Sequence, residues 1–202
     1  HDYSTILYDL TSLPPTIQHR LRDHTEWVRS VAFHKNLPLL ATGSDDCSIL
    51  LYNISTLPLS PIIQYHLKNI PTFVVCVTFH PSLPILSSST RKLVCLYDIV
   101  LSELVVKHRL NDHLDWVHCV VFHSDLPLYA TGSDDWTVII YDMSTLLPTI
   151  KYHLKDHMDS VCSIDFHPTL PLFASCSRDK FVLLYDLSTA IPTIKYRFCD
   201  HN

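Results

Sequence analysis

Residues 112–135 read DHLDWVHCVVFHSDLPLYATGSDD, and this stretch decides the fold because the chain contains it more than once. Residues 23–46 read DHTEWVRSVAFHKNLPLLATGSDD, and residues 156–179 read DHMDSVCSIDFHPTLPLFASCSRD. A more divergent version, NIPTFVVCVTFHPSLPILSSSTR, occupies residues 69–91. Recurrence at a fixed spacing of some tens of residues indicates a repeat architecture, in which each unit is one supersecondary motif.

The repeats divide the whole chain, 1–202, which we treat as one repeat segment. Equivalent leucines begin the four full repeats and lie 43 to 46 residues apart. The chain before them matches only the second half of a repeat, and its last residues open another. The predicted units are a half repeat at 1–20, full repeats at 21–66, 67–109, 110–153 and 154–197, and the start of a further repeat at 198–202.

Each repeat is predicted to hold four β-strands and no helix. In the third repeat, residues 116–123, 128–133 and 137–143 are apolar runs, each too short for a helix. Residues 149–154 alternate apolar and polar, as a half-exposed outer strand does. Turns rich in Pro, Ser and Asp separate these runs. Four strands in about 44 residues is the spacing of a β-propeller blade, so the predicted fold class is all-β.

Over its whole length the chain resembles the WD-repeat family of β-propellers. The family has Gly-His before the first strand, Ser-x-Asp at the second turn and Trp-Asp ending the third strand. The third repeat here has Asp112-His113, then Ser-Asp-Asp, then Tyr141-Asp142, so Asp replaces Gly and Tyr replaces Trp. The resemblance implies a propeller segment of four-stranded antiparallel blades, one half blade plus four full blades.

The resemblance also implies a buried hydrogen-bond network of His, Ser, Asp and the third-strand aromatic residue. The implied network residues are His24, Ser44, Asp46, Tyr52, His113, Ser133, Asp135, Tyr141, His157, Ser177, Asp179 and Tyr185. The half repeat keeps only Asp2 and Tyr8, and the final Asp-His pair ends at His201. Repeat two is expected to lack the network, because Ile70 replaces its His and its second turn is one residue short. A Ser-His-Asp hydrolase uses the same residue types, but a catalytic site is built once and this set recurs three times.

Composition excludes several classes of protein. Hydrophobic residues make up 47% and charged residues 17%, which is not the composition of a disordered chain. The net charge of −5 disfavours general nucleic-acid binding. No apolar run approaches the roughly 18 residues of a membrane helix, so no membrane insertion is expected. The seven cysteines contain no C-x-x-C pair, which favours reduced, buried thiols and a cytoplasmic or nuclear location over a disulfide framework or a zinc site.

Twelve of the 14 histidines recur at equivalent places in successive repeats, and only His1 and His118 fall outside this scheme. Residues one blade apart are too distant to coordinate one ion at about 2 Å, so neither a metal nor another cofactor is expected.

Function is expected where the repeats differ at exposed positions, namely the entry to the first strand and the second turn. The predicted partner-binding residues are Trp27, Arg29, Phe73, Val75, Trp116, His118 and Trp136. Trp and Arg dominate binding hot spots because they bury much area and keep a polar handle. The alternative for Trp27 and Trp116 is that they only pack against the neighbouring blade.

These residues predict a non-enzymatic scaffold that presents loops to a protein or peptide partner within a multi-subunit complex. One alternative is phosphate or nucleic-acid binding through the basic turns, Arg91-Lys92 and Arg178 with Lys180. Another is a propeller enzyme with a central site, for which His118 and Asp165 are the candidates.

The two partial repeats predict strand edges without a partner. The family implies about seven blades in a closed ring. We therefore expect further blades in the parent protein, or a second chain, to cover those edges.

Overall fold

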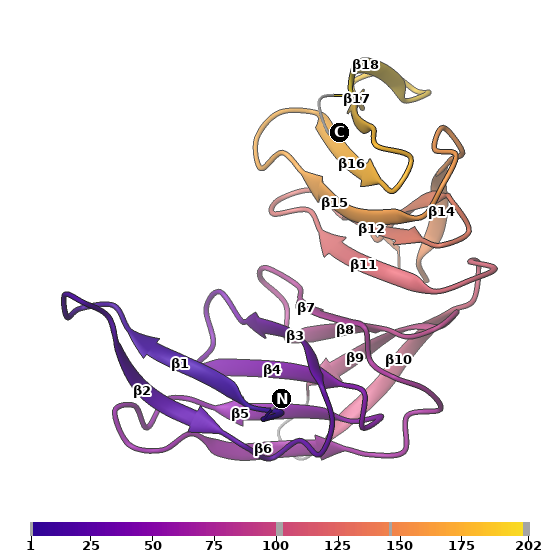
Figure 1. Ribbon diagram of the computed structural model, residues 1–202. Coiled ribbons are helices and arrows are strands. Elements are labelled where there is room, and N and C mark those ends of the chain that lie inside the picture. Colours follow the sequence, from indigo (N-terminus) through magenta and orange to yellow (C-terminus); the bar gives the residue numbers. More distant parts are fainter. Residues whose placement is uncertain (1, 100–102, 146, 200–202) are drawn as a thin grey trace.

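The computed structural model describes residues 2–99, 103–145 and 147–199 of the 202-residue chain, and the Asp-His pair ending at His201 lies outside them. Within these ranges the chain forms eighteen β-strands and no helix. One two-stranded and four four-stranded antiparallel sheets follow one another in sequence order. Figure 1 shows them fanned around an open arc, as in a propeller whose ring is incomplete.

The half blade, blade 1 and blade 2 come first along the chain. The half blade pairs β1 (Thr5–Asp9) with β2 (Thr16–Leu21). Blade 1 contains β3 (Val28–Phe33), β4 (Leu39–Ser44), β5 (Ile49–Asn53) and β6 (Ile62–Leu67). Blade 2 contains β7 (Cys76–Phe79), β8 (Ile85–Ser89), β9 (Val94–Ile99) and β10 (Leu104–Leu110).

Blades 3 and 4 repeat the same order. Blade 3 contains β11 (Val117–Phe122), β12 (Leu128–Ser133), β13 (Val138–Asp142) and β14 (Thr149–Leu154). Blade 4 contains β15 (Val161–Phe166), β16 (Leu172–Ser177), β17 (Val182–Asp186) and β18 (Thr193–Phe198). In blade 3 the second and fourth strands have the predicted bounds, whereas the first and third are one residue shorter at each end.

The predicted repeat boundaries fall at the ends of outer strands. Leu21, Leu67, Leu110 and Leu154 each end the fourth strand of one blade, so none of them begins the next blade. The first strands lie innermost, where β3 contacts β7, β7 contacts β11, and β11 contacts β15.

The hydrophobic core lies between the blades. One cluster joins blades 1 and 2, another joins blades 2 and 3, and a third joins blades 3 and 4. The second strands of blades 1 to 3 lie between neighbouring sheets, so β4, β8 and β12 are buried throughout their length, whereas β16 of blade 4 is only partly buried. A repeat with one buried face of its own is thus completed by its neighbours.

The two glycines allow neighbouring blades to approach closely. A Cβ atom on Gly132 would lie 2.7 Å from the sulfur of Cys119 and 2.8 Å from a methyl carbon of Val161 in blade 4. A Cβ atom on Gly43 would lie 2.6 Å from a methyl carbon of Val74, the equivalent valine of blade 2. Glycine is therefore required here by packing, since neither residue has a positive φ.

Blade 1 has one uncovered strand. Phe33 on β3 is 59% exposed, whereas its equivalents Phe79, Phe122 and Phe166 are 6% to 8% exposed. The preceding blade covers each of those three rings, but the half blade consists of outer strands only. At the other interfaces the preceding blade contributes a first and a second strand that cover the next blade. Within the described residues the half blade has no such inner strands, so Phe33 stays uncovered.

Candidate polar network and upper-face site

The ends of the strands define two faces of the fold. We call the upper face the end that holds the turns between second and third strands and the links from each outer strand to the next blade. The lower face holds the turns between first and second strands and between third and fourth strands. This division follows from the antiparallel order of each sheet. The predicted network and the predicted partner-binding residues belong to the upper face.

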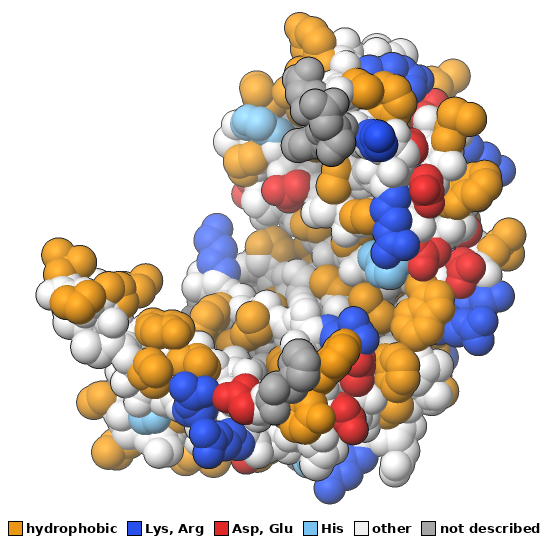
Figure 2. All heavy atoms as spheres, in the orientation of Figure 1, with side chains coloured by type: hydrophobic (Ala, Val, Ile, Leu, Met, Phe, Trp, Pro, Cys, Tyr) orange, Lys and Arg blue, Asp and Glu red, His pale blue; other side chains and the backbone are white. Residues whose placement is uncertain are grey.

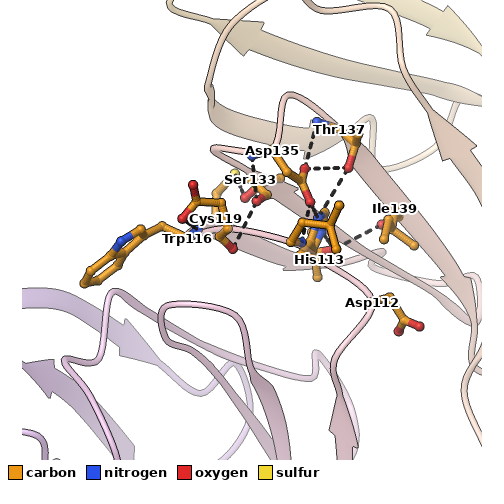
Figure 3. A network of polar contacts seen from close by, with 12 residues as sticks. Asp112, His113, Trp116, Cys119, Ser133, Asp135, Thr137 and Ile139 are labelled. Atoms are coloured by element: carbon orange, nitrogen blue, oxygen red, sulfur yellow. Dashed lines mark hydrogen bonds and ion pairs between the residues drawn. The ribbon is translucent and has the colours of Figure 1, made fainter.

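In blade 3 the network centres on His113, which precedes the first strand (Figure 3). Its Nδ1 lies 2.8 Å from Oδ2 of Asp135, and its Nε2 lies 2.7 Å from the hydroxyl of Thr131. Asp135 also accepts hydrogen bonds from the backbone N–H of Leu114 and from the hydroxyl of Thr137. An ionised carboxylate only accepts, so Nδ1 carries a proton and donates it.

The carboxylate of Asp135 is held ionised. Burial acts to raise its pKa, but hydrogen bonds from His113, Thr137 and the backbone of Leu114 outweigh burial, and its pKa is well below the usual value. The buried carboxylate is thus fully paired, as buried charges must be to be tolerated. It ties the chain before the first strand to the turn after the second strand.

Blades 1 and 4 repeat this geometry. His24 Nδ1 lies 2.8 Å from Asp46, and His157 Nδ1 lies 2.8 Å from Asp179. The pKa of Asp46 and that of Asp179 are also lowered, because hydrogen bonds again outweigh burial. Three independent copies of one arrangement indicate a scaffold element.

The hydroxyl that contacts each His ring differs from the predicted one. The ring of His24 contacts Thr42, and the equivalent partners in blades 3 and 4 are Thr131 and Ser175. The predicted serines lie two residues further along the strand. Ser44 accepts a hydrogen bond from the backbone N–H of Asp46 and donates to the backbone of Glu26, and the same bonds recur at Ser133 and Ser177.

The third-strand tyrosines bond to the aspartate of the Asp-His pair. The hydroxyl of Tyr141 donates to Asp112 over 3.0 Å, Tyr52 donates to Asp23 over 3.0 Å, and Tyr185 pairs with its equivalent, Asp156. Burial, followed by the charge of the neighbouring aspartate, raises the pKa of Tyr141 and of Tyr52 far above the usual value. The two departures from the family pattern, Asp for Gly and Tyr for Trp, are therefore hydrogen bonded to each other.

Blade 2 lacks the His–Asp pair. Ile70 is buried and belongs to the apolar cluster between blades 1 and 2. Tyr97 contacts Ser88 over 3.2 Å instead of an aspartate. Neither residue left from the half repeat takes part in a network, because Asp2 pairs with Arg20 and Tyr8 is exposed.

Trp136 occupies the tip of the upper turn of blade 3. Its φ of 71° lies in the left-handed region, and its side chain is 53% exposed. The equivalent residues Cys47 and Lys180 have φ values of 62° and 73°. The turn therefore demands this backbone conformation, and in blade 3 a bulky tryptophan adopts it.

Trp27 and Arg29 form a fixed group on blade 1. The Arg29 guanidinium lies over the Trp27 ring at 5.7 Å from its centroid and also forms a short ion pair with Asp45. The hydrogen bond to Asp45 raises the pKa of the Arg29 guanidinium above its usual value. Trp27 is half exposed and borders a hollow formed with Tyr3 and neighbouring residues.

The other predicted contact residues lie on blades 2 and 3. The rings of Phe73 and Trp116 pack together with centroids 6.1 Å apart. Figure 3 shows Trp116 pointing away from the network toward the neighbouring blade, so packing between blades is part of its role. His118 lies 2.7 Å from Asp134, and Val75 is half-buried.

The residues behind the alternative functions are dispersed. Arg91 and Lys92 are exposed on a turn of blade 2, whereas Arg178 and Lys180 are exposed on blade 4. Asp165 is exposed on β15, and in the described chain no polar contact joins it to His118. Among the described residues, no group of three or more His, Cys, Asp or Glu side chains is placed to hold a metal ion.

The recurring histidines after the first strand cap the lower turns. Nδ1 of His123 accepts hydrogen bonds from the backbone N–H groups of Asp125 and Leu126, both at 3.0 Å. The same two bonds recur at His34, His80 and His167. This role was not predicted, although the repeated Phe-His-x-x-Leu-Pro spacing contains the signal.

The cysteines are all free, and the expectation that they are buried is wrong for two of them. Cys162 and Cys199 are exposed, only Cys95 is fully buried, and the others are half-buried. Cys162 faces solvent because no further blade covers β15 within the described residues. In the described parts of the chain, no helix has the length and apolar character needed to cross a membrane.

Fanned four-stranded sheets, inner first strands and a polar network repeated from blade to blade define a β-propeller segment. Three stretches, residues 15–53, 104–142 and 148–186, match the model of the WD40 family, described as WD domain, G-beta repeat. They cover more than half of the chain, which therefore belongs to the WD40 repeat family. No match falls on residues 54–103, which include β7, β8 and β9 of the blade without a network. A comparison with curated proteins finds no match.

Repeats of this family generally mediate protein–protein interactions as scaffolds, and proteins built from them are generally not enzymes.

Proposed function

We propose that this chain is a non-enzymatic scaffold whose upper face binds a protein or peptide partner within a larger assembly. The free cysteines favour a reducing compartment, the cytoplasm or the nucleus. The observation that carries the proposal is Trp136, an exposed tryptophan on a strained turn.

A tryptophan is a costly choice at this position. Left-handed backbone costs a residue with a Cβ atom roughly 1–2 kcal/mol, and only Gly, Asn and Asp adopt it readily. The 53% exposed ring of Trp136 recovers little of that cost through burial. Residues held in such conformations cluster at functional sites, so the strain supports a role in binding.

A second group on blade 1 supports the same face. Trp27 and Arg29 form a pre-ordered pair, because the guanidinium is held between the indole ring and Asp45. Ordering before binding reduces the conformational entropy that a partner must remove. Trp and Arg are the residue types most enriched in binding hot spots.

The test separates strain from binding by substituting asparagine at equivalent positions. Trp136→Asn removes the ring and suits the left-handed turn, so the variant should be as stable as the parent or more stable. Lys180→Asn is the matched control, since Lys180 has the same backbone conformation on blade 4. The immobilised chain would be used to capture proteins from a cell extract, followed by quantitative mass spectrometry.

We expect a defined set of proteins to bind the parent and the Lys180→Asn variant and to be depleted at least tenfold with Trp136→Asn, a change of about 1.4 kcal/mol. Equal recovery with all three baits would refute a binding role for Trp136. A lower melting temperature of Trp136→Asn would show that the ring is structural.

A further inference from the structure

The lower face carries an apolar side chain in every turn that the structure describes. Between first and second strands, each blade exposes a leucine that precedes a proline. These leucines are 41% to 50% exposed and comprise Leu37, Leu83, Leu126 and Leu170. Their repetition on all four blades makes a ring of equivalent apolar protrusions.

The turns between third and fourth strands extend this surface outward. Leu13, Leu59, Leu147 and Ile191 are 65% to 93% exposed there. Figure 2 shows hydrophobic side chains covering the projecting turn that joins β1 to β2. An apolar face of this extent is unusual for a monomer and marks an interaction surface.

Charge is nearly absent from these turns. They contain one lysine, Lys35, and two acids, Glu103 and Asp125. In contrast, each described turn between second and third strands on the upper face carries at least two charged residues. The fold is therefore polarised, with a charged upper face and an apolar lower face.

The lower turns form a rigid platform. Twelve of the 13 prolines lie in them, and proline loses no side-chain freedom on burial. Hydrogen bonds also join turns of neighbouring blades, from Ser124 to the carbonyl of Pro168 and between His34 and the carbonyl of Leu83. A platform fixed in this way can be buried at low entropic cost.

The same face also contains hollows. One of about 210 Å³ lies between blades 1 and 2 and is lined by Leu37, Pro38, Pro84 and Ile99 with the amides of Asn53 and Gln64. In blades 2 to 4 the equivalent pair is charged, as in Lys151 with Asp142 at 3.9 Å. The replacement by two amides leaves this hollow uncharged, so it suits an inserted aliphatic side chain.

We propose that the lower face is the contact surface for a second copy of this chain, packed face to face. Protrusions and an apolar hollow on one face let each copy insert a leucine into the other, as a two-fold interface requires. At on the order of 100 Å² per fully exposed aliphatic side chain, the eight protrusions, which are 41% to 93% exposed, supply roughly 500 Å². Standard interfaces bury about 800 Å² per partner, so these side chains supply most of what a stable dimer needs.

The charges favour a second copy over a lipid surface. Peripheral attachment to anionic membranes requires clustered Lys and Arg, and one lysine with two acids does not provide that. The lower turns carry few charges, and the Lys–Asp pairs of blades 2 to 4 are neutral as pairs, so little like-charge repulsion opposes association with a copy of the same face.

Sedimentation velocity and light scattering over a range of concentrations would test the proposal. We expect the parent to be a dimer of about twice 23.2 kDa at micromolar concentration. The variant Leu59→Glu with Leu147→Glu should raise the dissociation constant about 100-fold or more, because both copies then present buried, unpaired carboxylates. Both side chains are exposed, so the fold should persist, as circular dichroism would show.

The matched control is Leu114→Glu with Met158→Glu, which changes exposed apolar residues of the upper face. These side chains are 76% and 81% exposed, and this variant should dimerise like the parent. A parent that is still monomeric at 100 µM, about two orders of magnitude above the concentration at which we expect the dimer, would overturn the proposal. Unchanged dimerisation of the Leu59→Glu, Leu147→Glu variant would also overturn it. So would a monomeric parent that floats with neutral vesicles, if the same variant no longer floats.

Discussion

Tyr129 of blade 3 forms a buried hydrogen bond with the hydroxyl of Ser87 in blade 2. Both side chains are fully buried. At the other interfaces the positions equivalent to Tyr129 are apolar, as at Phe173, and those equivalent to Ser87 are alanine, as at Ala130. The blade without the His–Asp network is thus bound to its successor by a Tyr–Ser hydrogen bond that the equivalent positions of the other interfaces lack.

Removing one side of this link should cost more than removing both. Tyr129→Phe leaves the Ser87 hydroxyl buried and unpaired, and should lower the free energy of unfolding by about 1–3 kcal/mol. Adding Ser87→Ala recreates the Phe–Ala combination of blades 3 and 4 and should recover most of the loss. Urea melts of the two single variants and the double variant measure the coupling, and additive losses would contradict it.

Asp135→Ala should destabilise the chain by about 1–3 kcal/mol, because it leaves the His113 ring and two backbone N–H groups without an acceptor. Arg91→Ala changes the equivalent position in blade 2, where no network exists, and should have little effect. Comparable urea midpoints for the two variants would refute a structural role for the His–Asp pair.

The free energy of unfolding should fall as the pH drops below about 6.5, the usual pKa of histidine. Burial lowers the pKa of His80 and of His123 in the folded chain. The unfolded chain then binds more protons than the folded chain, so acidification through the folded pKa values favours unfolding. Protonation of the aspartates whose pKa is lowered in the folded chain destabilises it separately, below about pH 4.

The variant His80→Asn isolates the histidine contribution to this pH dependence. An amide oxygen can accept the same turn N–H groups without titrating. Melting temperatures at pH 7.5 and 5.5 should differ less in this variant than in the parent. An equal difference in the two proteins would show that His80 does not contribute.

Gly132→Ala should destabilise the chain by about 1–3 kcal/mol through overpacking, since the new methyl group meets Cys119 and Val161. Adding Val161→Ala should recover part of the loss by vacating space. Cys176→Ala at the equivalent position of blade 4 should have little effect, because Cys176 is only half-buried. Thermal melts that place Gly132→Ala level with the parent would contradict close packing there.

The repeat pattern predicted the strands well, but it did not identify every hydrogen-bond partner. Thr42 and Ser44 lie two residues apart on one face of β4, and sequence spacing alone does not show which hydroxyl is level with the His24 ring. The bond between Tyr52 and Asp23 could have been inferred, because both depart from the family pattern in the same repeats. The sequence supports two interpretations of Trp116, because its contact with Phe73 depends on the angle between blades.

The lower face was not predicted, although its leucines are plain in the sequence. A Leu-Pro turn in one repeat is unremarkable, since single exposed leucines are common on protein surfaces. The apolar surface becomes evident only from the antiparallel strand order, which brings both kinds of lower turn to the same end of every blade.

The placement of the three indole rings has a spectroscopic consequence. Trp27, Trp116 and Trp136 all lie near the upper face, whereas the large aromatic rings buried between blades are tyrosine and phenylalanine. Tryptophan fluorescence therefore reports on the upper face and is nearly insensitive to changes in the core between the blades. A ligand docking beside Trp136 should shift or quench that emission while the near-ultraviolet dichroism of the buried tyrosines stays unchanged. The molecule thus carries a built-in optical probe on the face proposed to bind its partner.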